Sequence, residues 1–298
     1  MSDAIRYMHR YDGCIRNEKV YGQKWLNLIY GSPLGVFPLW VAIKRAWFSR
    51  WYGRKMSRPE SKSKIPDFIR EYDLDVSEFA APPNSFLSFN EFFSRKLKAD
   101  ARPVCEGHQH IAFPADGRHL GFSNLGRTSS IFVKGQSFDL ATLFQSKELA
   151  EPYENGSLVI SRLCPVDYHR FHFPADGQAS APKLINGFLY SVNPIALRKE
   201  ISIFWQNKRY LSFLETKSSG RIAQLLVGAT CVGSVSFTPN FPRTVVKGDE
   251  FGYFSFGGSS VLTLFEEGKV SLSPDLLEHS SNGIELYARM GDQMGCLT

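Results

Sequence analysis

Beyond Pro103 the sequence divides into short apolar runs separated by turn residues, and this pattern restricts the fold more than any other feature. The runs are rich in β-branched and aromatic residues, which favour antiparallel strands. They comprise residues Ile201–Trp205, Tyr210–Thr216, Ile222–Val227, Val232–Phe237, Val261–Phe265 and Ile284–Ala288. The sequence therefore predicts an α+β protein with N-terminal helices packed on a mainly antiparallel, β-sandwich-like core.

The region before Pro103 reads differently. Residues 1–56 are apolar and basic and are predicted to be helical, and residues 57–66 form a polar connector interrupted by prolines. Asp67–Phe79 and Phe89–Lys98 are predicted as further helices, the second capped by Ser88 or Asn90. These features divide the chain into an N-terminal segment, residues 1–66, and a main domain, residues 67–298.

Positive charge is concentrated in the N-terminal segment. Residues 1–66 hold 13 Lys and Arg against 4 Asp and Glu, and they carry four of the five tryptophans. Basic residues interleaved with aromatic rings suit the anionic surface of a bilayer better than they suit nucleic acid. The uncharged stretch Trp25–Ile43 contains two prolines, so it predicts one or two interfacial helices rather than a spanning helix. The alternative is a helical cap whose aromatic residues pack on the core.

The five cysteines are scattered and show no Cys-x-x-Cys spacing. They predict neither a disulfide framework nor a metal site, and they indicate a reducing compartment. The N-terminus lacks the apolar core and cleavage site of a secretory signal.

Gly257-Gly258-Ser259-Ser260 precedes the apolar run Val261–Phe265 and is the first candidate for chemistry. The Gly258 carbonyl has no side chain to shield it, and Ser259 carries a hydroxyl one residue away. Such a site can cut its own chain if a base lies nearby. By itself, the same sequence is typical of an ordinary loop.

Two further segments supply candidate bases and carboxylates. His169 and His172 lie three residues apart, and imidazole can take and return a proton near neutral pH. Phe-Pro-Ala-Asp-Gly occurs twice and presents Asp116 in one copy and Asp176 in the other. Buried structural histidines and plain Asp-Gly turns are the competing interpretations.

Taken in order, these segments resemble the phosphatidylserine decarboxylases, which are membrane-associated pyruvoyl enzymes. The resemblance runs from about Ser88 to the C-terminus. Its motifs are residues 89–97 (FNEFFSRKL), 101–103 (ARP), 114–117 (PADG), 167–172 (DYHRFH), 191–194 (SVNP), 207–209 (NKR), 227–230 (VGAT), 247–250 (KGDE) and 258–259 (GS). One departure is Ser260, where the family usually has threonine.

The resemblance implies a self-cleavage triad of Asp116, His172 and Ser259. The cut between Gly258 and Ser259 would leave a β chain, 1–258, and an α chain, 259–298, that stay together because the cleaved strand is embedded in the core. Ser259 would become a covalent pyruvoyl cofactor. That group would form a Schiff base with phosphatidylserine and yield phosphatidylethanolamine and carbon dioxide. His169 would be the proton donor in this decarboxylation. Asp176, in the identical turn, is the less favoured candidate for the role of Asp116.

The resemblance also implies a peripheral enzyme on the cytoplasmic face of a phosphatidylserine-containing cell membrane, and it suggests a homodimer. Two alternatives remain open. One is a non-catalytic membrane-binding β module in which Asp116, His169 and His172 are structural. The other is a pyruvoyl decarboxylase of a soluble amino acid, against which the basic, aromatic N-terminal segment argues.

Overall fold

The computed structural model describes residues 5–18, 46–127, 138–198, 200–229, 235–257 and 259–298. The interfacial helices predicted between Trp25 and Ile43, and Gly258 of the predicted cleavage site, lie outside these residues.

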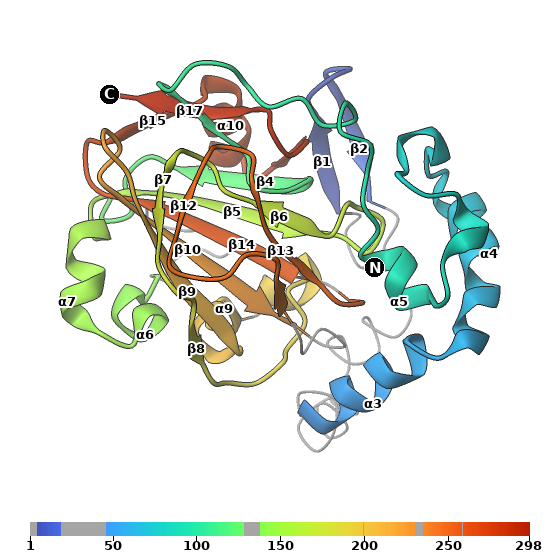
Figure 1. Ribbon diagram of the computed structural model, residues 1–298. Helices are drawn as coiled ribbons and strands as arrows, with labels where there is room; N and C mark the ends of the chain where they lie inside the picture. The colour runs from blue at the N-terminus through green and yellow to red at the C-terminus, as the bar shows by residue number, and fades with distance from the viewer. Residues whose placement is uncertain (1–4, 19–45, 128–137, 199, 230–234, 258) are drawn as a thin grey trace.

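One large sheet dominates the described chain (Figure 1). All of its pairings are antiparallel except that of β1 with β16. Its strands are, in spatial order, β12 (Arg243–Val245), β7 (Gly177–Ala179), β9 (Arg209–Glu215), β10 (Arg221–Gly228), β14 (Ser259–Phe265), β5 (Ser157–Leu163), β4 (Gly117–Phe122), β16 (Glu285–Ala288), β1 (Arg6–His9) and β2 (Cys14–Asn17), with β8 (Lys183–Ile185) also paired to β9.

Two three-stranded sheets lie against one face of the large sheet. One contains β11 (Val235–Phe237), β13 (Glu250–Phe254) and β6 (Arg170–His172), and the other contains β15 (Val270–Leu272), β17 (Gln293–Leu297) and β3 (His110–Ala112). A core cluster that includes Phe171, Phe254 and Leu226 fills the space between the layers. This arrangement confirms the predicted fold class, an α+β protein with a mainly antiparallel β core.

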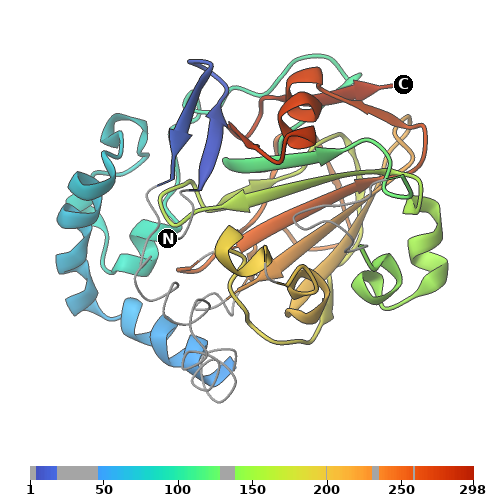
Figure 2. The same cartoon turned by 180° about the vertical axis from the view of Figure 1, so that it is seen from behind.

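Short helices cover the opposite face of the large sheet (Figure 2). Leu143, Leu197 and Phe204 from three of these helices pack there. The helices on this face are α6 (Leu140–Phe144), α7 (Lys147–Ala150), α8 (Pro194–Leu197) and α9 (Ile203–Gln206). Elsewhere in the described chain lie α3 (Ala46–Met56), α4 (Ile65–Tyr72), α5 (Phe89–Phe93) and α10 (Pro274–Ser281), and the 3-10 turns are η2 (Pro59–Lys64), η3 (Val76–Glu78), η4 (Pro83–Ser85) and η5 (Glu151–Tyr153).

Strand β14 shows why the core needs both layers. Val261 and Phe265 point into the cluster beneath the small sheets, whereas Leu262 and Leu264 point into the cluster beneath the helices. All seven residues of the strand are buried. Successive side chains of a strand alternate between its faces, so a continuous apolar run requires a cover on each side. The strand that begins with Ser259 is therefore held in the middle of the molecule.

Several sequence predictions of local structure were wrong. Residues 6–17 form the β1–β2 hairpin rather than a helix, because Asp12 and Gly13 make a turn in which Gly13 adopts a φ of 65°. Ile201–Trp205 lies mostly in α9, since a short apolar run has no period that separates a strand from a buried helical turn. The helix predicted over 67–79 is α4, which ends at Tyr72 because Asp73 takes the left-handed conformation.

The N-terminal helices reach the site region through aromatic packing. Ser88 caps α5, as predicted, by accepting a hydrogen bond from the Glu91 amide at 3.2 Å. Phe89 and Phe93 of α5 then pack edge-on against Phe256 at ring-centroid distances of 5.1 and 4.9 Å. Met56, Ile65 and Phe68 belong to the same cluster. The helices therefore support the segment that leads directly into Ser259.

Candidate active site

Ser259 is the first residue of β14. It lies between Leu163 of β5 and Gly228 of β10, and it has no exposed surface. Its hydroxyl has no hydrogen-bond partner among the described residues. Ser260 and Thr263 of the same strand are also buried without a partner among the described residues, so what distinguishes Ser259 is its position directly after Gly258.

The two Phe-Pro-Ala-Asp-Gly turns lie side by side and run in opposite directions. The Ala112 amide donates to the Pro174 carbonyl at 2.9 Å, and the His172 amide donates to the Pro114 carbonyl at 2.7 Å. This register sends Asp116 toward the histidine-bearing segment and Asp176 toward His108, with which Asp176 pairs at 2.7 Å. Asp116 is buried, whereas the Asp176 side chain is 44% exposed. The antiparallel pairing therefore places the two carboxylates, Asp116 and Asp176, at opposite ends of the paired turns.

His172 is buried and oriented by a backbone carbonyl. Its Nδ1 lies 2.9 Å from the Gly248 oxygen, and since a carbonyl only accepts, Nδ1 carries the proton. Its Nε2 is buried and has no partner among the described residues. Burial lowers the pKa of His172, so the ring is neutral at pH 7 and Nε2 can accept a proton.

Gly248 can present this carbonyl only because it is glycine. Its φ is 88°, and a Cβ at this position would lie 2.6 Å from a methyl carbon of Val104. The preceding residue is held as well, since the Lys247 amide donates to Asp176 at 2.7 Å. Asp176 therefore acts on the turn that orients His172 rather than on the imidazole.

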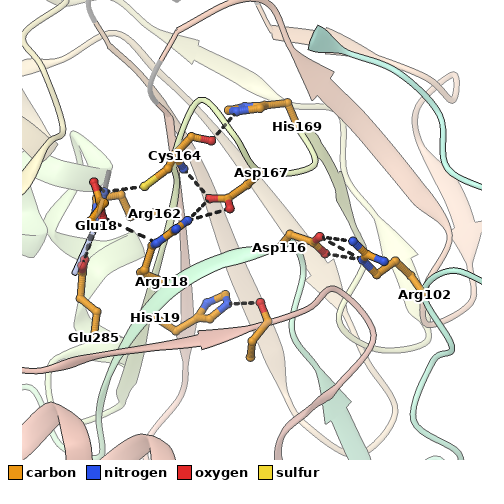
Figure 3. A network of polar contacts seen from close by, with 11 residues as sticks. Glu18, Arg102, Asp116, Arg118, His119, Arg162, Cys164, Asp167, His169 and Glu285 are labelled. Atoms are coloured by element: carbon orange, nitrogen blue, oxygen red, sulfur yellow. Dashed lines mark hydrogen bonds and ion pairs between the residues drawn. The ribbon is translucent and has the colours of Figure 1, made fainter. Parts of the chain in front are cut away.

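Asp116 is engaged by a guanidinium (Figure 3). Arg102 Nε donates to both carboxylate oxygens at 2.9 Å, and the Met290 amide donates to Oδ1 at 2.8 Å. No hydrogen bond joins Asp116 to His172, or His172 to Ser259, among the described residues. The charge of Asp116 nevertheless opposes the effect of burial on the pKa of His172. The carboxylate thus acts on this histidine through space.

His169 is fully buried and packed on an aromatic ring. Its Nε2 lies 2.8 Å from the Cys164 carbonyl and so carries the proton, while Nδ1 has no partner among the described residues. The Phe93 ring stacks on the imidazole at a centroid distance of 3.8 Å. Burial lowers the pKa of His169 to about 3. The ring is therefore neutral and presents an unshared electron pair at Nδ1.

A buried ionic network fixes the turn that holds His169 (Figure 3). Asp167 accepts from the Cys164 amide at 2.6 Å and from Arg118 Nη1 at 2.6 Å. Arg162, in the neighbouring strand, donates to Glu285 at 2.8 Å and to Glu18 at 2.6 Å. Buried charges are tolerated when every member is paired, and such a network resists movement. The network therefore holds the turn that carries His169 in a fixed position.

Phe93, Arg102 and Gly248 lie in motifs of the family resemblance, but no role was predicted for them or for Arg118 and Arg162. One signal was available: Arg162 follows the apolar run Leu158–Ile160, and an arginine inside a buried strand requires a carboxylate partner, as Arg118 does in β4. The partners themselves come from distant segments and become visible only when the strands are paired.

Comparisons with known proteins identify the family of this chain. The family model described as phosphatidylserine decarboxylase matches residues 89–296. The chain belongs to the phosphatidylserine decarboxylase family. It is 44% identical to a phosphatidylserine decarboxylase proenzyme of Fusobacterium nucleatum over 98% of both chains. Proteins with the same name in Clostridium novyi and Clostridium botulinum are 41% and 42% identical, over 98% of this chain and 99% of theirs. The matched residues include every candidate site residue of the family.

Proposed function

We propose that this chain is a phosphatidylserine decarboxylase, a carboxy-lyase that cuts itself between Gly258 and Ser259 and then converts phosphatidylserine to phosphatidylethanolamine and carbon dioxide. The observation that carries the proposal is the position of Ser259, buried at the start of the central strand β14 directly after Gly258, with a hydroxyl that has no partner among the described residues. The relatives that match nearly the whole chain are named proenzymes, which supports a self-processing precursor. They give no support to a non-catalytic module or to a decarboxylase of soluble amino acids.

Self-cleavage uses only groups of the chain. His172 Nε2 takes the hydroxyl proton of Ser259, and the oxygen attacks the Gly258 carbonyl carbon. The peptide C–N bond breaks as the nitrogen gains a proton, which leaves an ester. Loss of the Ser259 Cα proton then breaks the ester C–O bond and releases Gly258 as a carboxylate. The remaining unsaturated residue reacts with water, loses ammonia and becomes a pyruvoyl group.

The surroundings of Ser259 fit such a group. The position is buried, its neighbour in β10 is Gly228, which has no side chain, and its hydroxyl oxygen has no partner among the described residues. A pyruvoyl group supplies a carbonyl that accepts the electron pair left by departing carbon dioxide. We propose that His169 delivers the proton that replaces carbon dioxide. Because Nδ1 of the neutral ring has no proton, His169 must first take one, and this proton comes from solvent because decarboxylation consumes one proton overall.

We also propose that the protein binds membranes peripherally through its basic, aromatic N-terminal segment. In the described part, Trp51 on α3 is 53% exposed, and Lys55 lies 5.7 Å from its ring. A ring beside a cation is typical of side chains at headgroup depth. Within the described residues, none of the helices has the length and hydropathy needed to span a bilayer. The cytoplasmic face and the homodimer remain predictions.

The proposal is tested with the purified wild-type protein. We expect two fragments on a denaturing gel, the smaller with the mass of residues 259–298 bearing a blocked pyruvoyl end. Vesicles that contain phosphatidylserine should release carbon dioxide, and free serine should not. An intact chain with full activity, or turnover of free amino acids at a similar rate, would contradict the proposal.

The two aspartates of the repeated turn give a second test. Asp116→Asn should slow self-cleavage by about 10²-fold or more, because the protonated His172 loses the nearby negative charge that stabilises it. Asp176→Asn should slow it by less than about tenfold, since Asp176 only fixes the turn at Lys247. The half-time of cleavage after synthesis in a cell-free system measures both. A block caused by Asp176→Asn alone would reverse this assignment.

A further inference from the structure

Arg95 is a buried cation that forms no ion pair with a carboxylate of the described residues. Its residue is 5% exposed, and neither Nε nor Nη1 has a hydrogen-bond partner among the described residues. The guanidinium instead faces the rings of Phe79 and Phe92, at 4.7 and 5.1 Å from their centroids. Aromatic faces compensate only part of the cost of removing a full charge from water. A bound anion, such as a ligand, would therefore stabilise this buried guanidinium.

The carboxylates near Arg95 are already engaged. Asp116 is bound by Arg102, and Asp167 is bound by Arg118. Burial lowers the pKa of Arg95 to about 10, while the charges of these two aspartates oppose that effect from a distance. The group therefore stays cationic at pH 7, and its Nε and Nη1 donors have no partner among the described residues.

Arg95 also lies next to the proposed catalytic groups. Phe93, two residues earlier, stacks on His169, and the charge of Arg95 contributes to the lowered pKa of that histidine. The backbone is fixed at this point, because Arg170 Nε donates to the carbonyls of Ser94 and Arg95 at 3.0 and 3.3 Å. A ligand held by Arg95 would thus lie beside His169 in a defined position.

We propose that Arg95 binds an oxyanion of the substrate headgroup, an inference that rests on the function proposed above. A guanidinium offers a planar pair of donors that matches carboxylate and phosphate oxygens. The headgroup carries both kinds of oxyanion. Pairing with the phosphodiester is favoured, because its charge persists through the reaction. An ion pair to the carboxylate would stabilise the ground state and be lost as carbon dioxide departs.

The test uses the processed two-chain enzyme with Arg95→Met and Arg95→Lys. Arg95→Met should still cut itself, and its KM for phosphatidylserine in mixed micelles should rise about 10- to 100-fold, with a smaller change in kcat. The KM of Arg95→Lys should lie between the KM of Arg95→Met and that of the wild type. Arg221→Met is the matched control: Arg221 also lies over an aromatic ring, Phe213, at 5.2 Å, and its side chain is 42% exposed. Its KM should equal that of the wild type.

Two competitive inhibitors identify the oxyanion. Glycerophosphoethanolamine carries the phosphodiester without the carboxylate, and O-methylserine carries the carboxylate without the phosphodiester. If the phosphodiester is bound, Arg95→Met weakens inhibition by the first compound at least about tenfold and leaves the second unchanged. The reverse pattern assigns the carboxylate instead.

Unchanged KM and inhibition in a processed Arg95→Met enzyme would overturn the inference. The same holds for a lowered melting temperature with no change in KM, because that result indicates a purely structural cation. If Arg95→Met does not fold, Arg95→Lys decides by the same measurements. Failure of the wild-type chain to cut itself or to decarboxylate the lipid would refute the proposed function rather than this inference.

Discussion

Ser259→Ala is expected to give a folded, single-chain protein whose decarboxylase activity is indistinguishable from background. The substitution removes the oxygen that must attack the chain, so no pyruvoyl group can form. Since enzymes typically accelerate reactions by about 10⁶-fold or more, losing the reactive carbonyl should cost at least that factor. Folding should be spared, because the buried hydroxyl has no hydrogen bond to any described residue that the substitution would break. A denaturing gel, the intact mass and carbon dioxide release from phosphatidylserine measure the outcome.

Ser260→Ala is the matched control for this experiment. Ser260 is also buried with an unpaired hydroxyl, but it is the next residue along the strand and points to the opposite face of the sheet. We expect this variant to be cut, at a rate within about tenfold of the wild type. Decarboxylation by uncut Ser259→Ala protein, or a block of cleavage by Ser260→Ala alone, would refute the assignment of Ser259.

His169→Gln is expected to cut itself normally and then to decarboxylate about 10²- to 10⁴-fold more slowly. A glutamine amide can still donate to the Cys164 carbonyl, as Nε2 of the histidine does at 2.8 Å, so the turn should keep its shape. What is lost is Nδ1, the atom that can take up a proton and return it. Gel analysis reports the cleavage, and kcat on phosphatidylserine reports the later step.

The same substitution should change how stability depends on pH. Burial holds the pKa of folded His169 at about 3, below the value of about 6.5 in an unfolded chain. The unfolded state therefore binds more protons below pH 6.5, and stability is lost as the pH falls from there toward 3. His169→Gln should show a smaller drop in melting temperature between pH 7 and pH 5 than the wild type. His108→Gln, at a side chain that is 96% exposed, should behave like the wild type.

A cleavage defect in His169→Gln would instead give His169 a role in self-processing.

Much of the β core could be predicted from sequence. The runs containing Tyr210, Ile222, Val261 and Ile284 form or overlap β9, β10, β14 and β16 because each is apolar on both faces and bounded by turn residues. The capping role of Ser88 could be predicted as well. A serine just before a helix commonly accepts a hydrogen bond from a backbone amide of the first turn.

The rest depends on which strands become neighbours. Arg102 and Asp116 are close in sequence, but nothing in their spacing shows that this arginine, rather than His172, binds the carboxylate. Asp116 and Asp176 have identical local sequences, and only the antiparallel register of their turns separates their surroundings. The β1–β2 hairpin was missed because basic and aromatic residues on both sides of Asp12-Gly13 obscured the turn signal.

The position of β14 between β5 and β10 has a consequence for the life of the enzyme. Before the cut, folding is a unimolecular event in which the central strand is tethered to its neighbours. After the proposed cut the same strand would belong to a separate peptide, and a denatured enzyme could recover only through a bimolecular encounter that depends on concentration. The barrier to unfolding, set by a strand buried on both faces, then becomes the main safeguard of activity. Cleavage thus makes folding a one-time event.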